Sequence, residues 1–200
     1  MLGLPKSTEL KRQLSKGAMF SQFNMNTKAK EKFDDDIKKI TIVNEVSPRT
    51  TAISEGEKVD SFFVLHIILK KIDFDEKNII LISKLISQNM LFVLECENKA
   101  KLAIYHTKLL QTDWKNYSDL SIQLKGLNLD QVWENIIVQV SDLKIEQGNT
   151  LDEQIEKNEK RQKLQKQIIT LEKLTRAEKQ PKRKFELVGK IKLLQKELEG

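Results

Sequence analysis

The chain has 200 residues, which is enough for one domain of ordinary size or for a domain with an appendage. Its single cysteine, Cys96, excludes an internal disulfide framework and is typical of a reducing compartment. No apolar run approaches the ~20 residues that cross a bilayer, and the N-terminus lacks the apolar stretch of a signal peptide. We therefore expect a cytoplasmic protein without membrane contact.

The formal net charge of +6 is unevenly distributed. Residues 151–200 hold 14 Lys and Arg against 9 Asp and Glu, whereas residues 1–150 hold 21 against 20. Basic tails often contact nucleic acid or acidic partners, although a solvated helix face has the same composition. The sequence thus predicts a nearly neutral α/β domain over residues 1–148 and a charged segment over residues 149–200.

The first half of the chain alternates between helical and strand-like periodicity. Ser7 or Thr8 is a candidate cap for a first helix, and Asn26 or Thr27 for a second. The apolar and β-branched run at 59–71 is too apolar to have one wet face, so we expect a central strand there. In chain order, the expected elements are helices to about residue 16 and over 27–40, strands over 40–46, 50–53 and 59–71, and a helix from Asp75 to about residue 87.

The second half is expected to be rich in strands and to end in a helix. Asn128 or Asp130 is a candidate cap for that helix, which carries its apolar residues on one stripe. The expected strands span residues 89–97, 100–108, 109–114 and 120–124. A strand–helix unit followed by hairpins predicts an α+β fold, with a mixed, largely antiparallel sheet and helices packed on it. No Gly-rich turn joins a strand to a helix, which excludes a dinucleotide-binding fold.

The charged segment predicts a helical hairpin or a coiled coil. Thr150 can cap a long helix, and Gln180-Pro181 must interrupt it because proline cannot donate and clashes with the preceding turn. Apolar residues recur at spacings of three and four on both sides of the proline. We call these rows of apolar residues the seam. Helices this short are stable only when their apolar rows pack against a partner, which is either the other helix or another chain. The predicted seam consists of Leu164, Ile168, Leu171, Leu187, Ile191, Leu194 and Leu198.

One spacing resembles a catalytic signature. Glu97-Asn98-Lys99 is an E-x-K, which metal-dependent nucleases place on a strand beside an upstream carboxylate that helps to bind Mg²⁺. The candidate carboxylate partners are Asp73, Asp75 and Glu95. The alternative is that a hairpin turns at Asn98-Lys99, which leaves Glu97 at an exposed tip where polar residues are common.

Other reactive residue types give no site by themselves. His66 and His106 lie in expected strands, where we interpret each as a side chain that packs in the fold or has a satisfied hydrogen bond. Cys96 does not supply the further ligands that a zinc site would need at the usual spacing. Cys96 is interpreted as a small buried hydrophobe. Nucleophile-elbow, P-loop and zinc-protease motifs are absent from the sequence. We therefore expect no metal and no cofactor, and nothing in the sequence requires catalysis.

A basic cluster, consisting of Lys179, Lys182, Arg183 and Lys184, lies where the charged segment must bend. Such a cluster is favourable against phosphates because binding releases counterions. The alternative is a solvated helix tip that keeps the chain soluble. The basic cluster is the strongest functional feature in the sequence.

Several stretches resemble a known bacterial family. They are "LGLPKSTELKRQL", "ITIVNEVSP", "LISQNMLFVLE", "LAIYHTKLLQTDW", "NTLDEQIEKNEKRQKLQKQI" and "EKQPKRKFEL", and they extend over almost the whole chain. The family is that of domain of unknown function 4391. The resemblance implies a setting beside DNA methyltransferase and helicase genes in restriction-type defence loci. It implies no catalytic residues.

Three functions from different classes remain open. The first is a non-catalytic interaction protein of a defence system, whose domain docks a larger DNA-processing enzyme, such as a methyltransferase or helicase subunit, and whose charged segment reaches a second partner or DNA. The second is a metal-dependent nuclease or nuclease-derived subunit centred on Glu97 and Lys99. The third is a nonspecific nucleic-acid-binding module. A homo-oligomer through the charged segment is a further alternative.

Overall fold

A computed structural model describes residues 2–141 and 151–199 and separates the chain into two compact units, Met1–Asp142 and Leu143–Gly200. We call the first unit the body and the second the arm. The boundary expected between residues 148 and 149, and the cap expected at Thr150, lie outside the described residues.

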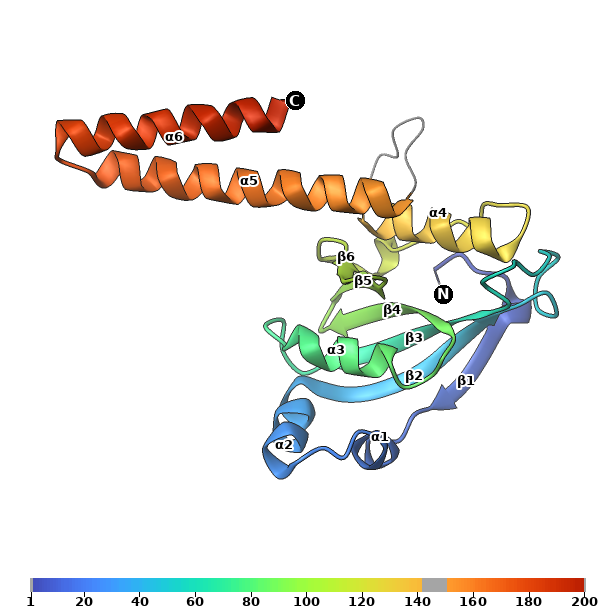
Figure 1. Cartoon of the computed structure of the whole chain (residues 1–200). Helices are drawn as coiled ribbons and strands as arrows, with labels where there is room; N and C mark the ends of the chain where they lie inside the picture. Colours follow the sequence, from blue (N-terminus) through green and yellow to red (C-terminus); the bar gives the residue numbers. More distant parts are fainter. Residues whose placement is uncertain (1, 142–150, 200) are drawn as a thin grey trace. The chain divides into compact units, whose positions relative to one another are not determined.

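The body has the predicted α+β fold (Figure 1). Its described strands form one seven-stranded sheet, which is antiparallel except for one parallel pair. The elements in chain order are η1 (Lys6–Thr8), β1 (Glu9–Gln13), α1 (Lys16–Gln22), α2 (Thr27–Asp36), β2 (Ile37–Val46), β3 (Phe62–Leu69), α3 (Glu76–Ser83), β4 (Asn89–Cys96), β5 (Lys99–Tyr105), β6 (Leu109–Gln111), β7 (Lys115–Asn116), η2 (Tyr117–Asp119) and α4 (Leu129–Ser141).

The spatial order of the sheet is β1-β2-β3-β4-β5-β6, and β7 pairs with β5. The parallel pair is β3 and β4, in register from Phe62↔Asn89 to Ile68↔Glu95. Parallel neighbours need a crossover connection, and α3 supplies it. The predicted strand–helix unit followed by hairpins is therefore confirmed.

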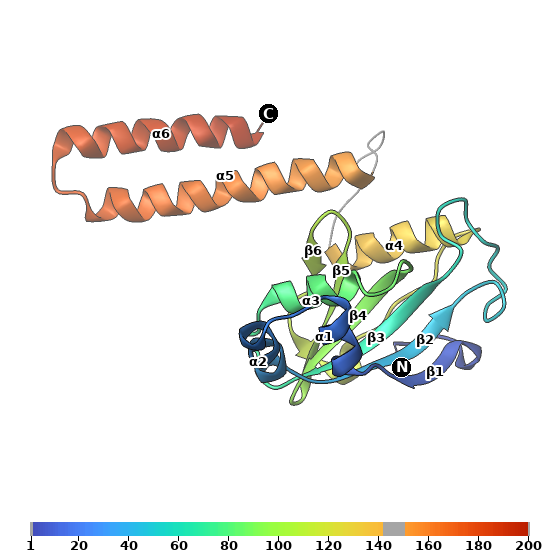
Figure 2. The same ribbon diagram turned by 60° about the horizontal axis from the view of Figure 1, so that its bottom comes forward.

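The strand β3 is central, as its composition predicts, because β2 and β4 pair with its two edges and helices cover both faces of the sheet. Its side chains alternate, so Leu65 and Ile67 face one layer and Phe62 and Val64 the other. On the first side, one buried cluster joins Leu65 and Ile67 to Phe33 of α2 and Ile79 of α3. Figure 2 shows α1, α2 and α3 grouped on this side of the sheet.

The opposite face of the sheet is covered by α4. The indole of Trp133 lies 5.1 Å from the ring of Phe62, measured between ring centroids. Val132, Ile136 and Val140 are fully buried on the same helix, at the spacing of four that its amphipathic stripe predicts. The body is thus a sheet between two helical layers.

The prediction of a helix that runs to about Lys16 is wrong. Glu9–Gln13 is instead an edge strand that pairs with β2, and α1 begins only at Lys16. Two leucines at i and i+4, Leu10 and Leu14, fit a short helix as well as an edge strand. The hydrogen bonds that β2 offers decide between them, and such tertiary pairing commonly overrides local preference.

The second expected helix begins as predicted but ends early. The side chain of Asn26 caps it by accepting a hydrogen bond from the backbone N–H of Ala29. The helix stops at Asp36, and Ile37 and Ile40 belong to β2. Both isoleucines are buried in the same cluster as Phe33, so their apolar spacing reflects a shared core and not one helix face.

Two expected strands are absent from the described residues. The segment 50–53 forms turns, because the hydroxyl of Thr50 bonds to the carbonyls of Glu45 and Ser47. The segment 120–124 is irregular, although Leu120 and Ile122 are buried as a strand would bury them. Its hydrogen bonds go to Leu2 and to the side chain of Gln139, so it has no strand neighbour.

The arm consists of α5 (Leu151–Ala177) and α6 (Pro181–Glu199), which lie side by side (Figures 1 and 2). Lys160, in the first half of α5, forms an ion pair of 3.1 Å with Glu197, near the end of α6, so the helices are antiparallel. Pro181 occupies the first position of α6, where its missing N–H has no cost. The predicted helical hairpin is therefore confirmed.

Candidate functional site

The basic cluster lies at the bend of the arm. α5 ends at Ala177 and α6 begins at Pro181, so three residues make the turn, and the N–H of Gln180 donates to Glu178 Oε1 at 2.9 Å. Lys179, Lys182, Arg183 and Lys184 are all exposed. None of the four forms an ion pair with a residue that the structure describes. Their charge is therefore directed to the solvent.

A groove of about 660 Å³ runs along this bend. Leu174 and Leu187 supply apolar side chains to its lining, and Lys179, Arg183 and Lys190 supply cationic ones. Glu178 and Glu186 also line it, and Glu178 is already engaged with the backbone of the turn. The groove combines an apolar floor with a surplus of positive charge, which suits an anionic ligand more than a neutral one.

All seven residues of the predicted seam are shielded in the arm. Leu164, Ile168 and Ile191 are buried, and the others are half-buried. α5 and α6 are in extensive contact, so the two apolar seams cover each other. The seam is what holds the hairpin together.

The E-x-K residues lie at a hairpin tip. β4 and β5 pair up to Cys96↔Lys99, so Glu97 and Asn98 form the two-residue loop, one position earlier than expected. Glu97 has a φ of +56°, a conformation typical of tight hairpin turns, and its side chain is exposed. Lys99 is also exposed, at the start of β5.

The expected carboxylate partners are engaged elsewhere. Asp75 caps α3 by accepting from the N–H of Lys77, and its second oxygen lies 2.5 Å from Lys32 Nζ. Glu95 Oε2 lies 2.5 Å from His66 Nε2, and Asp73 is exposed between β3 and α3. No three His, Cys, Asp or Glu side chains in the described part of the chain are grouped so that they could hold a metal ion.

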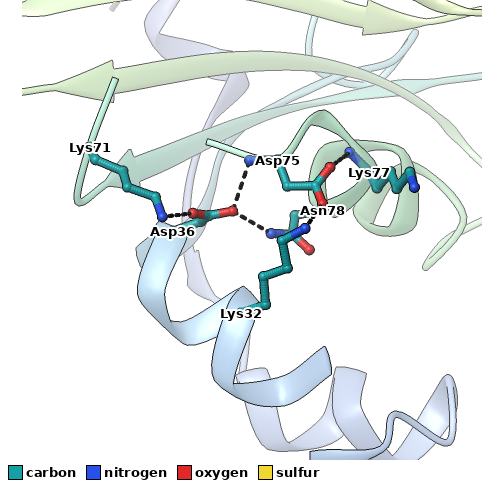
Figure 3. Close-up of polar contacts among 6 residues, drawn as sticks. All are labelled: Lys32, Asp36, Lys71, Asp75, Lys77 and Asn78. Carbon is teal, nitrogen blue, oxygen red and sulfur yellow. Dashed lines mark hydrogen bonds and ion pairs between the residues drawn. The ribbon is translucent and has the colours of Figure 1, made fainter. Parts of the chain in front are cut away.

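A buried carboxylate that the sequence analysis did not single out lies at the centre of a polar network (Figure 3). Asp36, the last residue of α2, is only 1% exposed. Its Oδ2 accepts hydrogen bonds of 2.8 Å from the N–H of Asp75 and from Asn78 Nδ2, and its Oδ1 lies 2.7 Å from Lys71 Nζ. Two segments far apart in sequence, the end of α2 and residues 71–78, thus meet at one side chain.

A signal for this network is present in the sequence. Asp34-Asp35-Asp36 places three acids at the C-terminal end of a helix, where the helix dipole disfavours negative charge. An acid that persists there needs donors from elsewhere in the fold, and Asp36 receives three. Because its oxygens are occupied by the chain's own donors, Asp36 fastens α2 to the start of α3 and is not free to act as a base or a metal ligand.

The charges of the network shift the pKa values of three of its members, Asp75, Lys32 and Lys71. The hydrogen bond from Lys32 and then the N–H of Lys77 lower the pKa of Asp75 below its ordinary value. The hydrogen bond to Asp75 raises the pKa of Lys32, and the hydrogen bond to Asp36 raises the pKa of Lys71. All three residues are therefore held in their charged forms near neutral pH.

The histidine and cysteine side chains fit structural roles. His66 pairs with Glu95, and its ring lies 5.9 Å from that of Tyr117, so it has a hydrogen-bond partner as interpreted from the sequence. Burial, and next the charge of Glu97, raise the pKa of the Cys96 thiol. A buried thiol with a raised pKa is a poor nucleophile, which agrees with its interpretation as a small hydrophobe.

Comparison with known proteins identifies a family without a known activity. The family model described as domain of unknown function (DUF4391) matches residues 2–198. The chain belongs to this family. No curated protein and no solved structure matches the chain. The DUF4391 match therefore covers both the body and the arm, and it assigns a role to neither. None of the described helices is long and apolar enough to cross a membrane.

Proposed function

We propose that this DUF4391 protein is a non-catalytic accessory subunit that contacts nucleic-acid phosphates through the basic cluster of its arm. The observation that carries the proposal is that Lys179, Lys182, Arg183 and Lys184 are exposed together at the bend, with no ion pair to any described residue. Clustered cations without acidic partners bind phosphates through counterion release, without reading the base sequence.

The proposal also assigns the body to a protein partner. The proposed setting is a bacterial restriction-type defence system, which the family resemblance supports, and the proposed partner is a larger DNA-processing enzyme such as a methyltransferase or helicase subunit. The arm then adds affinity for DNA that is already bound by the partner, because linked binding sites raise the effective local concentration.

Two charge variants of equal size test the phosphate contact. In the first, all four residues of the basic cluster are replaced by Gln. In the matched control, four exposed cations scattered over the body, Lys11, Lys28, Lys115 and Lys125, are replaced by Gln. Both variants carry the same net charge. Binding to duplex DNA is measured by fluorescence anisotropy over a series of salt concentrations.

We expect the slope of log affinity against log salt to fall by up to about 3.6 in the cluster variant, because each of the four cations contributes about 0.9 per phosphate contact. The control variant keeps the slope of the native protein. Equal slopes in the two variants, or no DNA binding by the native protein, would contradict the proposal and leave the cluster as a solubilising surface.

A further inference from the structure

A second surface of the arm lies on the side of α6 that faces away from α5. The seam residues of α6 begin at Leu187 and recur at spacings of four and three, and a second stripe with the same spacings begins two residues earlier, at Phe185. Two residues correspond to about 200° around a helix, so the two stripes lie on opposite sides. We call this second stripe the outer face; it consists of Phe185, Val188, Gly189, Lys192, Leu193 and Lys196.

The outer face exposes large apolar side chains. Phe185 is 80% exposed and Leu193 is 70% exposed, and Val188 is also exposed between them. Each of these residues costs free energy in contact with water, and a group of them on one helix face is typical of an interaction site. The seam between α5 and α6 does not need them, because its own residues are already shielded.

Gly189 makes an indentation in the middle of this face. It lies one turn after Phe185 and one turn before Leu193, and a Cβ added to it would meet no atom within 4 Å. Glycine inside a helix is unfavourable by about 1 kcal/mol relative to alanine. Here the gap leaves room for a side chain of a partner between two exposed apolar residues.

The charges of the outer face indicate which partner fits. Lys192 and Lys196 are exposed on the same stripe. Two described acids flank it, Glu186 and Glu197, and Glu197 already forms an ion pair with Lys160. A second copy of the chain packed parallel to the first through this face would bring lysines against lysines. A helix with apolar residues at spacings of three and four, flanked by Asp or Glu, would cover the apolar residues and pair with the lysines.

We infer that the outer face of α6 docks an acidic amphipathic helix of a partner protein. This inference rests on the proposed function, since it names the class of partner that the arm recognises in addition to DNA. DNA alone does not explain the exposed Phe185 and Leu193, because phosphate contacts need cations and not apolar side chains.

Two designed peptides serve as probes. The first is a helical peptide with Leu at alternating spacings of three and four and Glu at the flanking positions; the second has Lys in place of Glu. Binding to the full-length protein is measured by fluorescence anisotropy. We expect the acidic peptide to bind at least about tenfold more tightly than the basic one, because only the acidic peptide complements Lys192 and Lys196.

Variants separate the apolar from the charged contribution. Phe185→Ser with Leu193→Ser should weaken binding of the acidic peptide by at least about tenfold, as expected for apolar residues at the centre of an interface. Lys192→Gln with Lys196→Gln should weaken it and reduce its salt dependence. The matched control is Leu127→Ser, which removes an 85% exposed leucine from the body and should leave peptide binding unchanged.

Three results would overturn the inference. They are equal binding of the two peptides, unchanged binding by both outer-face variants, or a dimer in sedimentation analysis that Phe185→Ser with Leu193→Ser dissociates, since a second copy would then be the occupant. Both outer-face variants retain the four residues of the basic cluster. Failure of peptide binding with intact DNA binding therefore rejects this inference and not the proposed DNA contact.

Discussion

Gly56 lies against Asp130 so closely that a Cβ on Gly56 would be 2.7 Å from the backbone nitrogen of Asp130 and closer still to its carboxyl group. The contact exists because the Asp130 carboxylate accepts hydrogen bonds from three consecutive backbone amides, those of Glu57, Lys58 and Val59. Burial would raise the pKa of Asp130, but these amides lower it below its ordinary value. The loop before β3 is thereby fastened to the first turn of α4.

Two single methyl additions should have opposite effects. Gly56→Ala should destabilise the protein by about 1–3 kcal/mol, because the new Cβ displaces the Asp130 carboxylate from its amides. Gly189→Ala adds the same group to an open position inside a helix and should stabilise the arm by about 0.5–1 kcal/mol. Chemical denaturation followed by circular dichroism measures both. If Gly56→Ala left the free energy of unfolding unchanged, the loop would be able to move away from Asp130 without loss of stability, and this prediction would be contradicted.

Asp36 should matter far more for stability than its neighbour Asp35. Asp36→Ala should lower the free energy of unfolding by about 3 kcal/mol, because it leaves the N–H of Asp75 and the side chain of Asn78 without their acceptor. Asp35 is exposed, so Asp35→Ala should change the free energy of unfolding by less than about 0.5 kcal/mol. Urea denaturation of the two variants checks this prediction, and equal effects would contradict the role assigned to Asp36.

The pair of Asp75 and Lys32 should contribute to stability in a pH-dependent way. Because the pKa of Asp75 is lowered in the folded state, its contribution is present above the ordinary carboxyl pKa and is lost as the pH falls through the lowered value. Lys32→Gln removes the main cause of the shift. The native protein should therefore be more stable than Lys32→Gln near neutral pH.

The difference in stability between the native protein and Lys32→Gln should shrink as the pH falls below 3.8, the ordinary pKa of an Asp carboxyl group. Urea denaturation at a series of pH values measures it. Lys28→Gln, which removes an exposed cation from the first turn of the same helix, is the control and should show no such dependence. A difference between the native protein and Lys32→Gln that is independent of pH would contradict the pairing.

Glu97→Ala and Lys99→Ala should each change stability by less than about 0.5 kcal/mol, as is usual for exposed turn positions. Both should also leave DNA binding unchanged. The decisive measurement is cleavage of duplex DNA with Mg²⁺, by the protein alone and with its partner subunits. Cleavage that either substitution abolishes would establish the nuclease hypothesis and reject an accessory role.

The body should fold without the arm. A shortened chain that ends at Gly148 retains the sheet and both helical layers, which contain most of the buried side chains. We expect it to be soluble and to unfold cooperatively in urea. A non-cooperative transition would mean that the arm contributes to the core of the body.

The sequence by itself determined the elements whose signals are local. Asn26 caps α2 and Asp75 caps α3, as their side chains and positions predict, and the run that contains β3 is recognisable as a central strand because it is apolar on both faces. Pro181 separates two helices because its ring cannot continue the first. Each of these features depends on residues within a few positions of one another.

Only the tertiary structure decided the features that depend on distant segments. Glu9–Gln13 became a strand because β2 offered it hydrogen bonds, and the segment around Ile122 did not because no strand lies beside it. Asp130, a candidate helix cap, instead binds a loop about 70 residues away, and Asn128 caps α4 by accepting from the N–H of Gln131. The basic cluster could be located from the sequence because a proline fixes the bend. Two features of the arm depend on how α5 packs against α6. They are the absence of ion pairs between the basic cluster and described residues, and the outer face of α6. Neither follows from the sequence, because packing determines which side of each helix is left uncovered.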